Sequence, residues 1–174
     1  AIRNKPGANW KGVANRFSKM FVLINRFVWG KIKRLKDPII KIKEVEVEIV
    51  MPHEKVLLDK KEILKNNLKY KDEYLIISTI LVCSNSNMII DGHHRYAALK
   101  ELGYKKIPVT LINYFSDKIM TDKDNSLLKE DIIKHSETGN LYEPKSTKHI
   151  IFCNESKKWH PITLVSSLYN LSLK

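Results

Sequence analysis

The chain has 174 residues, and 43% of them are hydrophobic, which is enough for the core of one compact domain and excludes a wholly disordered protein. The formal charge of +12 is concentrated at the start: residues 1–36 hold ten Lys and Arg and no acid, whereas the other 138 residues hold 21 Lys and Arg against 19 Asp and Glu. Because the rest of the chain is nearly neutral, its composition argues against a nucleic-acid-binding domain.

Residues 1–40 are predicted to be a basic amphipathic N-terminal extension. Between residues 13 and 36, apolar side chains recur every three or four positions with Lys and Arg between them, which predicts a helix that ends at Asp37-Pro38. The longest uncharged run of this helix, residues 20–25, is far shorter than the ~20 residues that cross a bilayer, so we expect the helix not to span a membrane. We expect residues 13–36 to contact a protein partner or a membrane surface.

The cysteines and the basic helix bear on the cellular compartment. Cys83 and Cys153 lie far apart and form no Cys-x-x-Cys pair, which indicates a reducing compartment and structural roles. The acid-free helix is also typical of a mitochondrial targeting segment. We therefore expect a mitochondrial or a cytoplasmic location.

Residues 41–153 are predicted to form an α/β (α+β) domain with a mixed sheet and flanking helices, followed by a weakly patterned C-terminal tail over 154–174. Runs of apolar or alternating residues between turn residues predict strands at 41–50, 75–82, 87–90, 107–112 and 150–152, with a hairpin turn at 84–86. Helices are predicted at 59–69 with Asp59 as N-cap, from the end of the 87–90 strand to Gly103, and at 126–136.

The pentapeptide 91–95, Asp-Gly-His-His-Arg, stands where the strand over 87–90 meets the following helix. A glycine turn at that point aims free backbone N–H groups and the positive end of the helix dipole at one place, which suits an anion. The two imidazoles and the guanidinium add donors for phosphate oxygens, and Asp91 can hold Mg²⁺ or orient a histidine. The alternative is a buried aspartate that caps a helix, but adjacent histidines point about 100° apart and do not share one apolar face. The pentapeptide therefore predicts a phosphate site.

Two further segments are candidates for chemistry. Glu54 follows Pro52-His53 at the end of the first predicted strand and can act as a general base, although an exposed turn glutamate is also ordinary. Residues 145–149, Lys-Ser-Thr-Lys-His, can complete a phosphate cradle or be an ordinary polar turn. A zinc site from His53, His93, His94 and a cysteine is another alternative, without the paired ligand spacing of such sites. The chain has neither a Walker loop nor a Rossmann glycine motif.

These motifs together resemble a known superfamily. Residues 89–100, followed by Leu102-Gly103 and Ile107-Pro108-Val109, resemble the nucleotide-phosphate motif of the ParB and sulfiredoxin-like superfamily. Within it, the Asp-Gly-His-His-Arg form is most similar to the free serine kinases, of the ADP-dependent L-serine kinase type. Pro52-His53-Glu54 resembles their Pro-His-Glu turn, and residues 144–149 resemble their Pro-Lys-Thr-Thr-Arg-His segment.

The resemblance implies that the chain binds ADP or ATP with Mg²⁺ and moves a phosphate to serine or a similar small hydroxyl substrate. Glu54, as the base, and Asp91, as the Mg²⁺ ligand, would be the catalytic residues. The nucleotide-binding residues would be Gly92, His93, His94, Arg95, Ser146, Thr147 and His149.

The chain also departs from those kinases. Residues 76–79 replace their Lys-Pro pair, and their substrate-side Trp has no counterpart between residues 116 and 126. The alternative function is therefore a catalytically degenerate, nucleotide-binding accessory subunit of a larger mitochondrial or membrane-associated complex, anchored through the N-terminal helix. A ParB-like nucleic-acid module would need a helix-turn-helix after residue 152, which the sequence does not predict.

Overall fold

A four-stranded mixed sheet forms the centre of the computed structural model, which describes residues 38–121 and 127–173. Its strands run in the order β1 (Ile39–Glu46), β6 (Lys106–Ile112), β4 (Ile80–Cys83) and β5 (Ile89–Asp91). The central pair β4 and β6 is parallel, whereas both outer pairs are antiparallel. Every residue of β4 is buried, as expected for a strand covered on both faces. The predicted α+β class with a mixed sheet is confirmed, and the predicted N-terminal helix lies outside the described residues.

The described residues form three α-helices: α2 (Leu58–Asn66), α3 (His93–Glu101) and α4 (Lys129–Thr138). Helix α3 packs Tyr96, Ala98 and Leu99 into the core and ends before Gly103, whose φ of +77° is the left-handed conformation expected after a helix. Helix α2 begins one residue earlier than predicted, so that Asp59 lies in its first turn and Leu57 is the N-cap. No hydrogen-bonding side chain caps it there.

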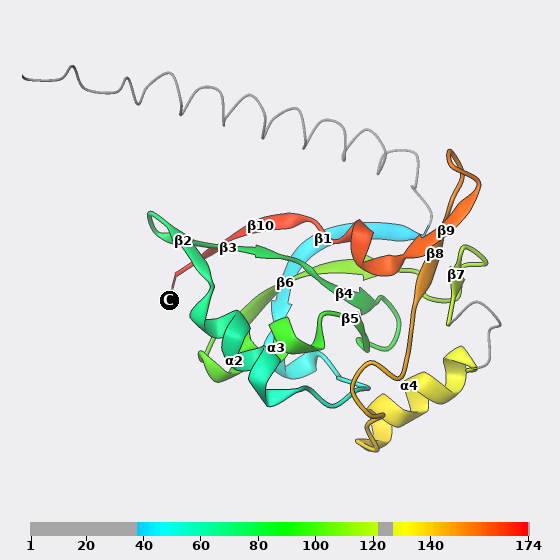
Figure 1. The fold of residues 1–174 in the computed structure, drawn as a ribbon, viewed down its shortest axis with the longest axis horizontal. Helices are drawn as coiled ribbons and strands as arrows, with labels where there is room; N and C mark the ends of the chain where they lie inside the picture. The colour runs from blue at the N-terminus through cyan, green and yellow to red at the C-terminus, as the bar shows by residue number, and fades with distance from the viewer. Residues whose placement is uncertain (1–37, 122–126, 174) are drawn as a thin grey trace, which may run out of the picture. The chain divides into compact units, whose positions relative to one another are not determined.

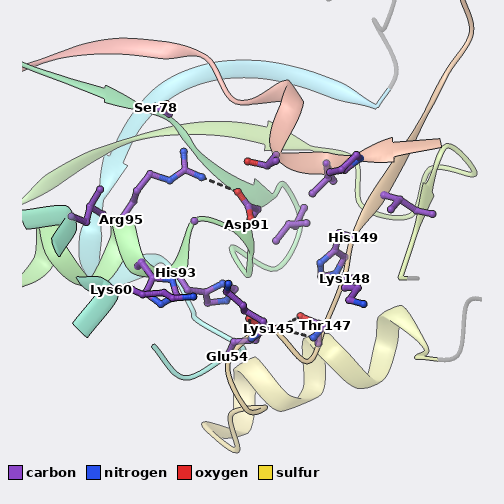
Figure 2. Close-up of a pocket in the computed structure, with 18 residues that line it drawn as sticks. Glu54, Lys60, Ser78, Asp91, His93, Arg95, Lys145, Thr147, Lys148 and His149 are labelled. Atoms are coloured by element: carbon purple, nitrogen blue, oxygen red, sulfur yellow. Dashed lines mark hydrogen bonds and ion pairs between the residues drawn. The ribbon is translucent and has the colours of Figure 1, made fainter. Parts of the chain in front are cut away.

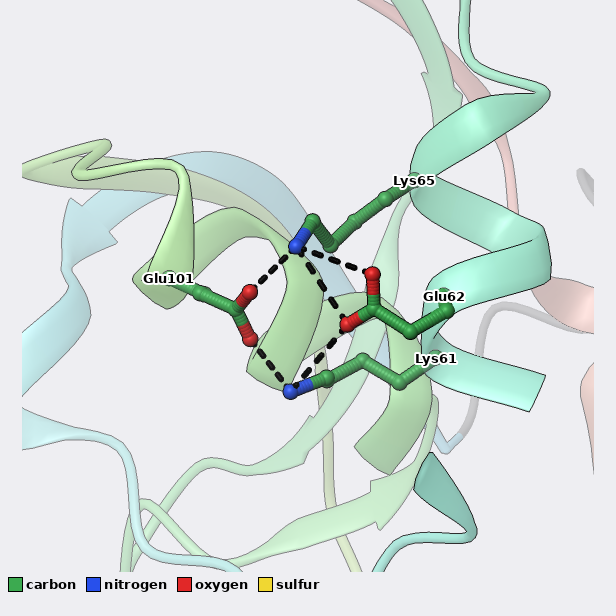
Figure 3. Close-up of polar contacts among 4 residues, drawn as sticks. All are labelled: Lys61, Glu62, Lys65 and Glu101. Carbon is green, nitrogen blue, oxygen red and sulfur yellow. Dashed lines mark hydrogen bonds and ion pairs between the residues drawn. The ribbon is translucent and has the colours of Figure 1, made fainter. Parts of the chain in front are cut away.

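Helix α2 buries none of its residues completely, and ion pairs connect it to α3 (Figure 3). The ammonium groups of Lys61 and Lys65 both pair with the carboxylate of Glu101 on α3, and Glu62 joins the same network. This network connects the helix that follows Glu54 with the helix that begins at His93.

The predicted strand over 75–82 is two strands in different sheets. β3 (Tyr74–Ser78) pairs with β2 (Lys69–Lys71) and β10 (Leu168–Ser172), and the chain then crosses to β4 through Thr79. The Thr79 hydroxyl bonds to the Thr110 hydroxyl at 2.7 Å and accepts the Ser167 N–H at 3.0 Å. A polar residue that is fully buried is tolerated at this crossing because its hydroxyl is satisfied.

The segment after residue 153, expected to be a tail, contributes to two sheets (Figure 1). β8 (Ile150–Cys153) pairs with β7 (Ile119–Met120) and with β9 (Lys158–Pro161). A 3₁₀ helix over Ile162–Val165 then leads into β10, which completes the β2–β3–β10 sheet. Another 3₁₀ turn, Val47–Ile49, ends the first predicted strand, so that β1 stops at Glu46. The domain boundary at 153 stays a prediction.

Candidate functional site

Gly92 makes the turn between β5 and α3, as the strand–glycine–helix pattern predicts. Its φ is +104°, a conformation that residues with a side chain rarely adopt, and an added Cβ would lie 3.0 Å from Nη2 of Arg95. No side-chain hydrogen bond caps the start of α3. The first-turn N–H groups of α3 are therefore available to an anionic ligand.

This turn opens on a cavity of about 820 Å³ (Figure 2). In Figure 2, Glu54, Lys145 and Thr147 lie together on one side of the cavity, and the Asp91–Arg95 pair lies on another. Most of the predicted site residues line it, namely Glu54, Asp91, Gly92, His93, His94, Arg95, Thr147 and His149. Ser146 does not line it, because its side chain is exposed and donates to the carbonyl oxygen of Glu143 at 2.7 Å.

His93 and His94 are fixed as neutral donors. Nε2 of His93 accepts the backbone N–H of His53 at 3.3 Å, and Nε2 of His94 accepts that of Leu57 at 3.1 Å. Burial, with the neighbouring charges of His53 and His149, places the pKa of His93 well below its ordinary value. Burial and the charges of two lysines also lower the pKa of His94. Each neutral ring then carries its proton on Nδ1, the donor it can offer to a phosphate oxygen.

Arg95 is bound by the protein itself. Its Nη2 donates to Oδ2 of Asp91 at 2.8 Å, and its Nη1 donates to the carbonyl oxygen of Thr79 at 2.8 Å. Burial lowers the pKa of Arg95, and the charge of Asp91 opposes that change. Within the part of the chain that the structure describes, Oδ1 of Asp91 has no hydrogen-bond partner, so it is the oxygen that a metal ion or ligand can meet.

Glu54 is buried, contrary to the alternative of an exposed turn glutamate. Its Oε1 accepts the backbone N–H of Thr147 at 2.7 Å and also the Thr147 hydroxyl, while its Oε2 accepts the N–H of Lys145 at 3.1 Å. Lys145 itself has a φ of +63°, an unusual value for a residue with a side chain, which turns the backbone around the carboxylate. The Pro-His-Glu turn and the segment 145–149 therefore form one structural unit.

His53 and His149 lie buried beside this unit. Nδ1 of His53 is 2.6 Å from the carbonyl oxygen of Ile89, and its Nε2 is 2.7 Å from the hydroxyl oxygen of Thr147. Nε2 of His149 is 2.8 Å from the hydroxyl oxygen of Tyr114. Burial, followed by the charges of His53 and Lys129, lowers the pKa of His149 to about 3, so this ring is neutral at physiological pH.

Several residues that line the cavity were missed from the sequence, among them Lys60 and residues 161–163. Lys60 on α2 lies beside Lys145, and this neighbouring ammonium group lowers the pKa of Lys60. No residue pattern signals this, because the two lysines come together only through the packing of α2. Residues 161–163 also line the cavity, although the weak pattern after residue 153 predicted a tail.

The metal alternatives can be compared with the geometry. Among residues 38–121 and 127–173, no three His, Cys, Asp or Glu side chains are grouped to hold a metal ion, so the zinc alternative gains no support. Mg²⁺ usually binds through one or two carboxylates together with substrate phosphates and waters, and Asp91 fits that pattern. The described helices also include none with the length and apolar character of a membrane span.

Comparisons with known proteins support the sequence resemblance, although no family model matches the chain. An ATP-dependent L-serine kinase of Staphylothermus marinus is 34% identical over 95 residues, which are 51% of this chain and 38% of that protein. A ParB-like protein of Sulfolobus acidocaldarius is 30% identical over 112 residues, 60% of this chain and 55% of that protein. An ADP-dependent L-serine kinase of Thermococcus kodakarensis is 50% identical over 32 residues, 18% of this chain and 13% of that protein. The chain thus spans less than two thirds of the length of these relatives.

Solved structures extend the likeness to the fold. A free serine kinase variant in complex with AMP aligns with a TM-score of 0.51 at 15% identity, over 66% of this chain and 91% of that one. Another variant, in complex with ADP, aligns with a TM-score of 0.51 at 15% identity, over 64% of this chain and 88% of that one. The resemblance to the ParB and sulfiredoxin-like superfamily, and within it to the serine kinases, is confirmed.

Proposed function

We propose that this chain is a nucleotide-dependent phosphotransferase that moves a phosphate from ADP or ATP to the hydroxyl group of serine or a similar small molecule. The observation that carries the proposal is the placement of a buried carboxylate, Glu54, in the same cavity as the uncapped N-terminus of α3. One group can take a proton and the other can hold a phosphate. The relatives named L-serine kinase support the same chemistry.

In this mechanism, the first-turn amides of α3 and the Nδ1–H groups of His93 and His94 hold the transferring phosphate. Glu54 accepts the proton of the acceptor hydroxyl, whose oxygen then attacks the phosphorus while the nucleotide leaves with the electron pair of the broken bond. Arg95 holds Asp91 in place. Mg²⁺, when bound at Asp91, would neutralise phosphate charge. Positioning and charge neutralisation supply most of the catalysis in such reactions.

Serine is the acceptor that the relatives' names suggest, and the same names include both ATP-dependent and ADP-dependent enzymes. Trp159 does not replace the substrate-side Trp of the kinases, because it lies on β9 against Phe152 and does not line the cavity. We therefore propose serine as the acceptor and either ADP or ATP as the phosphate donor. None of the comparisons supports the alternative of an accessory subunit, a mitochondrial location or a partner for residues 13–36.

The decisive experiment incubates the purified chain with Mg²⁺, serine and either ADP or ATP, and follows phosphoserine by ³¹P NMR. We expect phosphoserine with at least one nucleotide, and Glu54→Gln should lower turnover at least about 100-fold while nucleotide affinity stays within about threefold. Glu143→Gln, which changes an exposed glutamate outside the cavity, is the matched control and should keep its activity. Nucleotide binding without turnover in the unaltered chain would instead favour the degenerate accessory subunit.

A further inference from the structure

We infer that the hydroxyl group of Thr147 is a two-position switch. It donates its hydrogen bond to Glu54 while Glu54 is ionised, and to His53 when Glu54 is protonated. One hydroxyl, with one hydrogen, contacts both Oε1 of Glu54 and Nε2 of His53. The inference rests on the proposed function, in which Glu54 is the base. It makes Thr147 and His53 positioning residues for that base.

The contact with Ile89 determines which ring nitrogen of His53 carries the proton. A carbonyl oxygen only accepts, so the 2.6 Å contact to Ile89 requires the proton of His53 on Nδ1. His53 is fully buried, and burial lowers its pKa against the opposing effect of Glu54, so the ring is neutral at physiological pH. Its Nε2 then carries a lone pair that faces the Thr147 hydroxyl at 2.7 Å. The Thr147 hydrogen therefore has two acceptors and serves one of them at a time.

The two carboxylate oxygens of Glu54 accept different numbers of hydrogen bonds. Oε1 of Glu54 accepts both the N–H and the hydroxyl of Thr147, whereas Oε2 accepts only the N–H of Lys145 among the described residues. Oε2 thus has the free lone pair for the proton of an acceptor hydroxyl. These three hydrogen bonds are charge-assisted, and each becomes weaker when Glu54 takes up the proton of the acceptor hydroxyl.

The switch offsets part of this weakening. When the acceptor O–H bond breaks, its proton binds Oε2 of Glu54, its oxygen forms the new bond to phosphorus, and the nucleotide leaves with the electron pair of the old bond. Oε1 becomes an uncharged carbonyl oxygen, a weaker acceptor than a carboxylate oxygen or an imidazole nitrogen. The Thr147 hydroxyl then rotates to Nε2 of His53, while its backbone N–H stays on Oε1. No covalent bond of Thr147 or His53 changes, and Glu54 later returns its proton to solvent.

The charged and titratable groups around this unit come from every neighbouring element. His94 on α3 faces Glu54, Lys60 on α2 lies beside His94 and Lys145, and Lys145 precedes Thr147 in the same turn. His93, His149 and His135 face His53. Substitutions at Thr147 leave all of these in place, so a change in their pH dependence can be assigned to the switch, whereas His53→Asn also removes a neighbour of His93 and His149 and is compared with the Thr147 variants.

A kinetic experiment compares the pH dependence of kcat/KM for four chains: unaltered, Thr147→Val, Thr147→Ser and His53→Asn. Valine removes one donor from the carboxylate, so the acid limb should move about one pH unit higher. Asparagine keeps an amide donor near the Nδ1 position for Ile89 but removes the second acceptor, so the hydroxyl stays on Glu54 and the acid limb should move lower. Both changes should lower kcat about tenfold with nucleotide affinity unchanged, and serine should restore the unaltered profile. Shifts in the same direction, or a serine variant as impaired as valine, overturn the switch.

A second measurement needs no turnover. The ¹⁵N shift of His53 Nε2 should indicate an Nδ1–H tautomer in the unaltered chain, and Glu54→Gln, which imitates the uncharged glutamate, should move Nε2 toward the hydrogen-bonded value. Glu54→Gln combined with Thr147→Val should abolish that movement. An unchanged Nε2 in Glu54→Gln overturns the switch even if phosphoserine forms, whereas absence of phosphoserine with the expected ¹⁵N change defeats only the proposed function. If His53→Asn does not fold, the Thr147→Val and Thr147→Ser pair and the ¹⁵N measurement still decide.

Discussion

The carboxylate of Glu54 accepts the backbone N–H of Thr147 at 2.7 Å across 93 residues of sequence. This one contact ties the turn after β1 to the turn before β8, and Lys145 adds a second contact at the other carboxylate oxygen. Because backbone donors set the position of Glu54, side-chain substitutions in the turn 145–147 leave the carboxylate in place. The chemistry and the placement of Glu54 can therefore be tested separately.

Gly92→Ala should damage both stability and nucleotide binding. The substitution forces a side chain into φ +104° and places its Cβ 3.0 Å from the Arg95 guanidinium. The left-handed conformation alone costs about 1–2 kcal/mol, and movement of Arg95 or of the α3 amides should lower ADP affinity at least about tenfold. Urea denaturation and ADP titration measure the two effects.

Gly139→Ala is the matched control for that prediction. Gly139 also has a positive φ, +70°, but an added Cβ would meet nothing within 4 Å. It should therefore lose about 1–2 kcal/mol of stability and keep its ADP affinity. Equal loss of ADP affinity in both variants would contradict the special role of the turn at Gly92.

How much of this site the sequence predicts follows from the range of the interactions. The β5–Gly92–α3 turn is local, so residue types over a dozen positions predict it, and the glycine has the conformation that the motif requires. Whether Glu54 is buried depends on backbone donors 91 and 93 residues away, which no local pattern contains. Ser146 and Thr147 look equivalent in sequence, but the turn at Lys145 sends one to solvent and the other to Glu54.

The same limit applies to the fold. β4 and β6 are continuous apolar runs and are predicted as strands, since burial on both faces leaves a clear pattern. The division between β3 and β4 at Thr79 is not predicted, because the apolar run is uninterrupted except for one Ser-Thr pair. β10 has partly exposed residues and a weak pattern, and it forms a strand because β3 offers it an edge.

Stability should fall as the pH falls below the ordinary histidine range. The pKa of His149 drops on folding from an ordinary value of 6.5 to about 3, and burial lowers the pKa values of His53 and His93 as well. As the pH falls, the unfolded chain therefore takes up protons on these histidines before the folded chain does. The stabilisation is fully present above about pH 6.5 and is lost as the pH falls toward the folded values, by up to about 1.4 kcal/mol per pH unit for each histidine.

Urea denaturation at pH 7.5, 6 and 5 checks this dependence. His149→Gln keeps an amide near Tyr114 but cannot take up the proton, so its stability should depend less steeply on pH, by up to about 1.4 kcal/mol per unit. A slope equal to that of the unaltered chain would show that His149 does not contribute.

Asp91→Asn should separate the structural role of the carboxylate from a metal role. Arg95 is largely buried, and Asp91 is its partner in the only salt bridge it makes with a described residue. Loss of that charge should cost about 1–3 kcal/mol, allowing for the partial exposure of Asp91. If Oδ1 of Asp91 also holds Mg²⁺, nucleotide affinity should fall at least about tenfold in Mg²⁺ but little in EDTA. An equal loss of affinity in Mg²⁺ and in EDTA would assign Asp91 to the positioning of Arg95 alone.

Lys60 should contribute to nucleotide binding through charge. It lies beside Lys145 at the cavity, and neither ammonium group forms a salt bridge with a carboxylate of the described residues, so the two repel each other unless an anion lies between them. Lys60→Gln should weaken ADP binding about three- to tenfold and reduce its dependence on salt concentration. Lys55→Gln is the matched control, because Lys55 lies outside the cavity and is paired with Glu143. Titrations of both variants with ADP at low and high salt measure the effect. Equal ADP affinity of the two variants would contradict this prediction, because the charge of Lys60 would then not act on the nucleotide. Lys60 and Lys145 would instead contact the acceptor substrate, and Lys60→Gln would change the KM for serine.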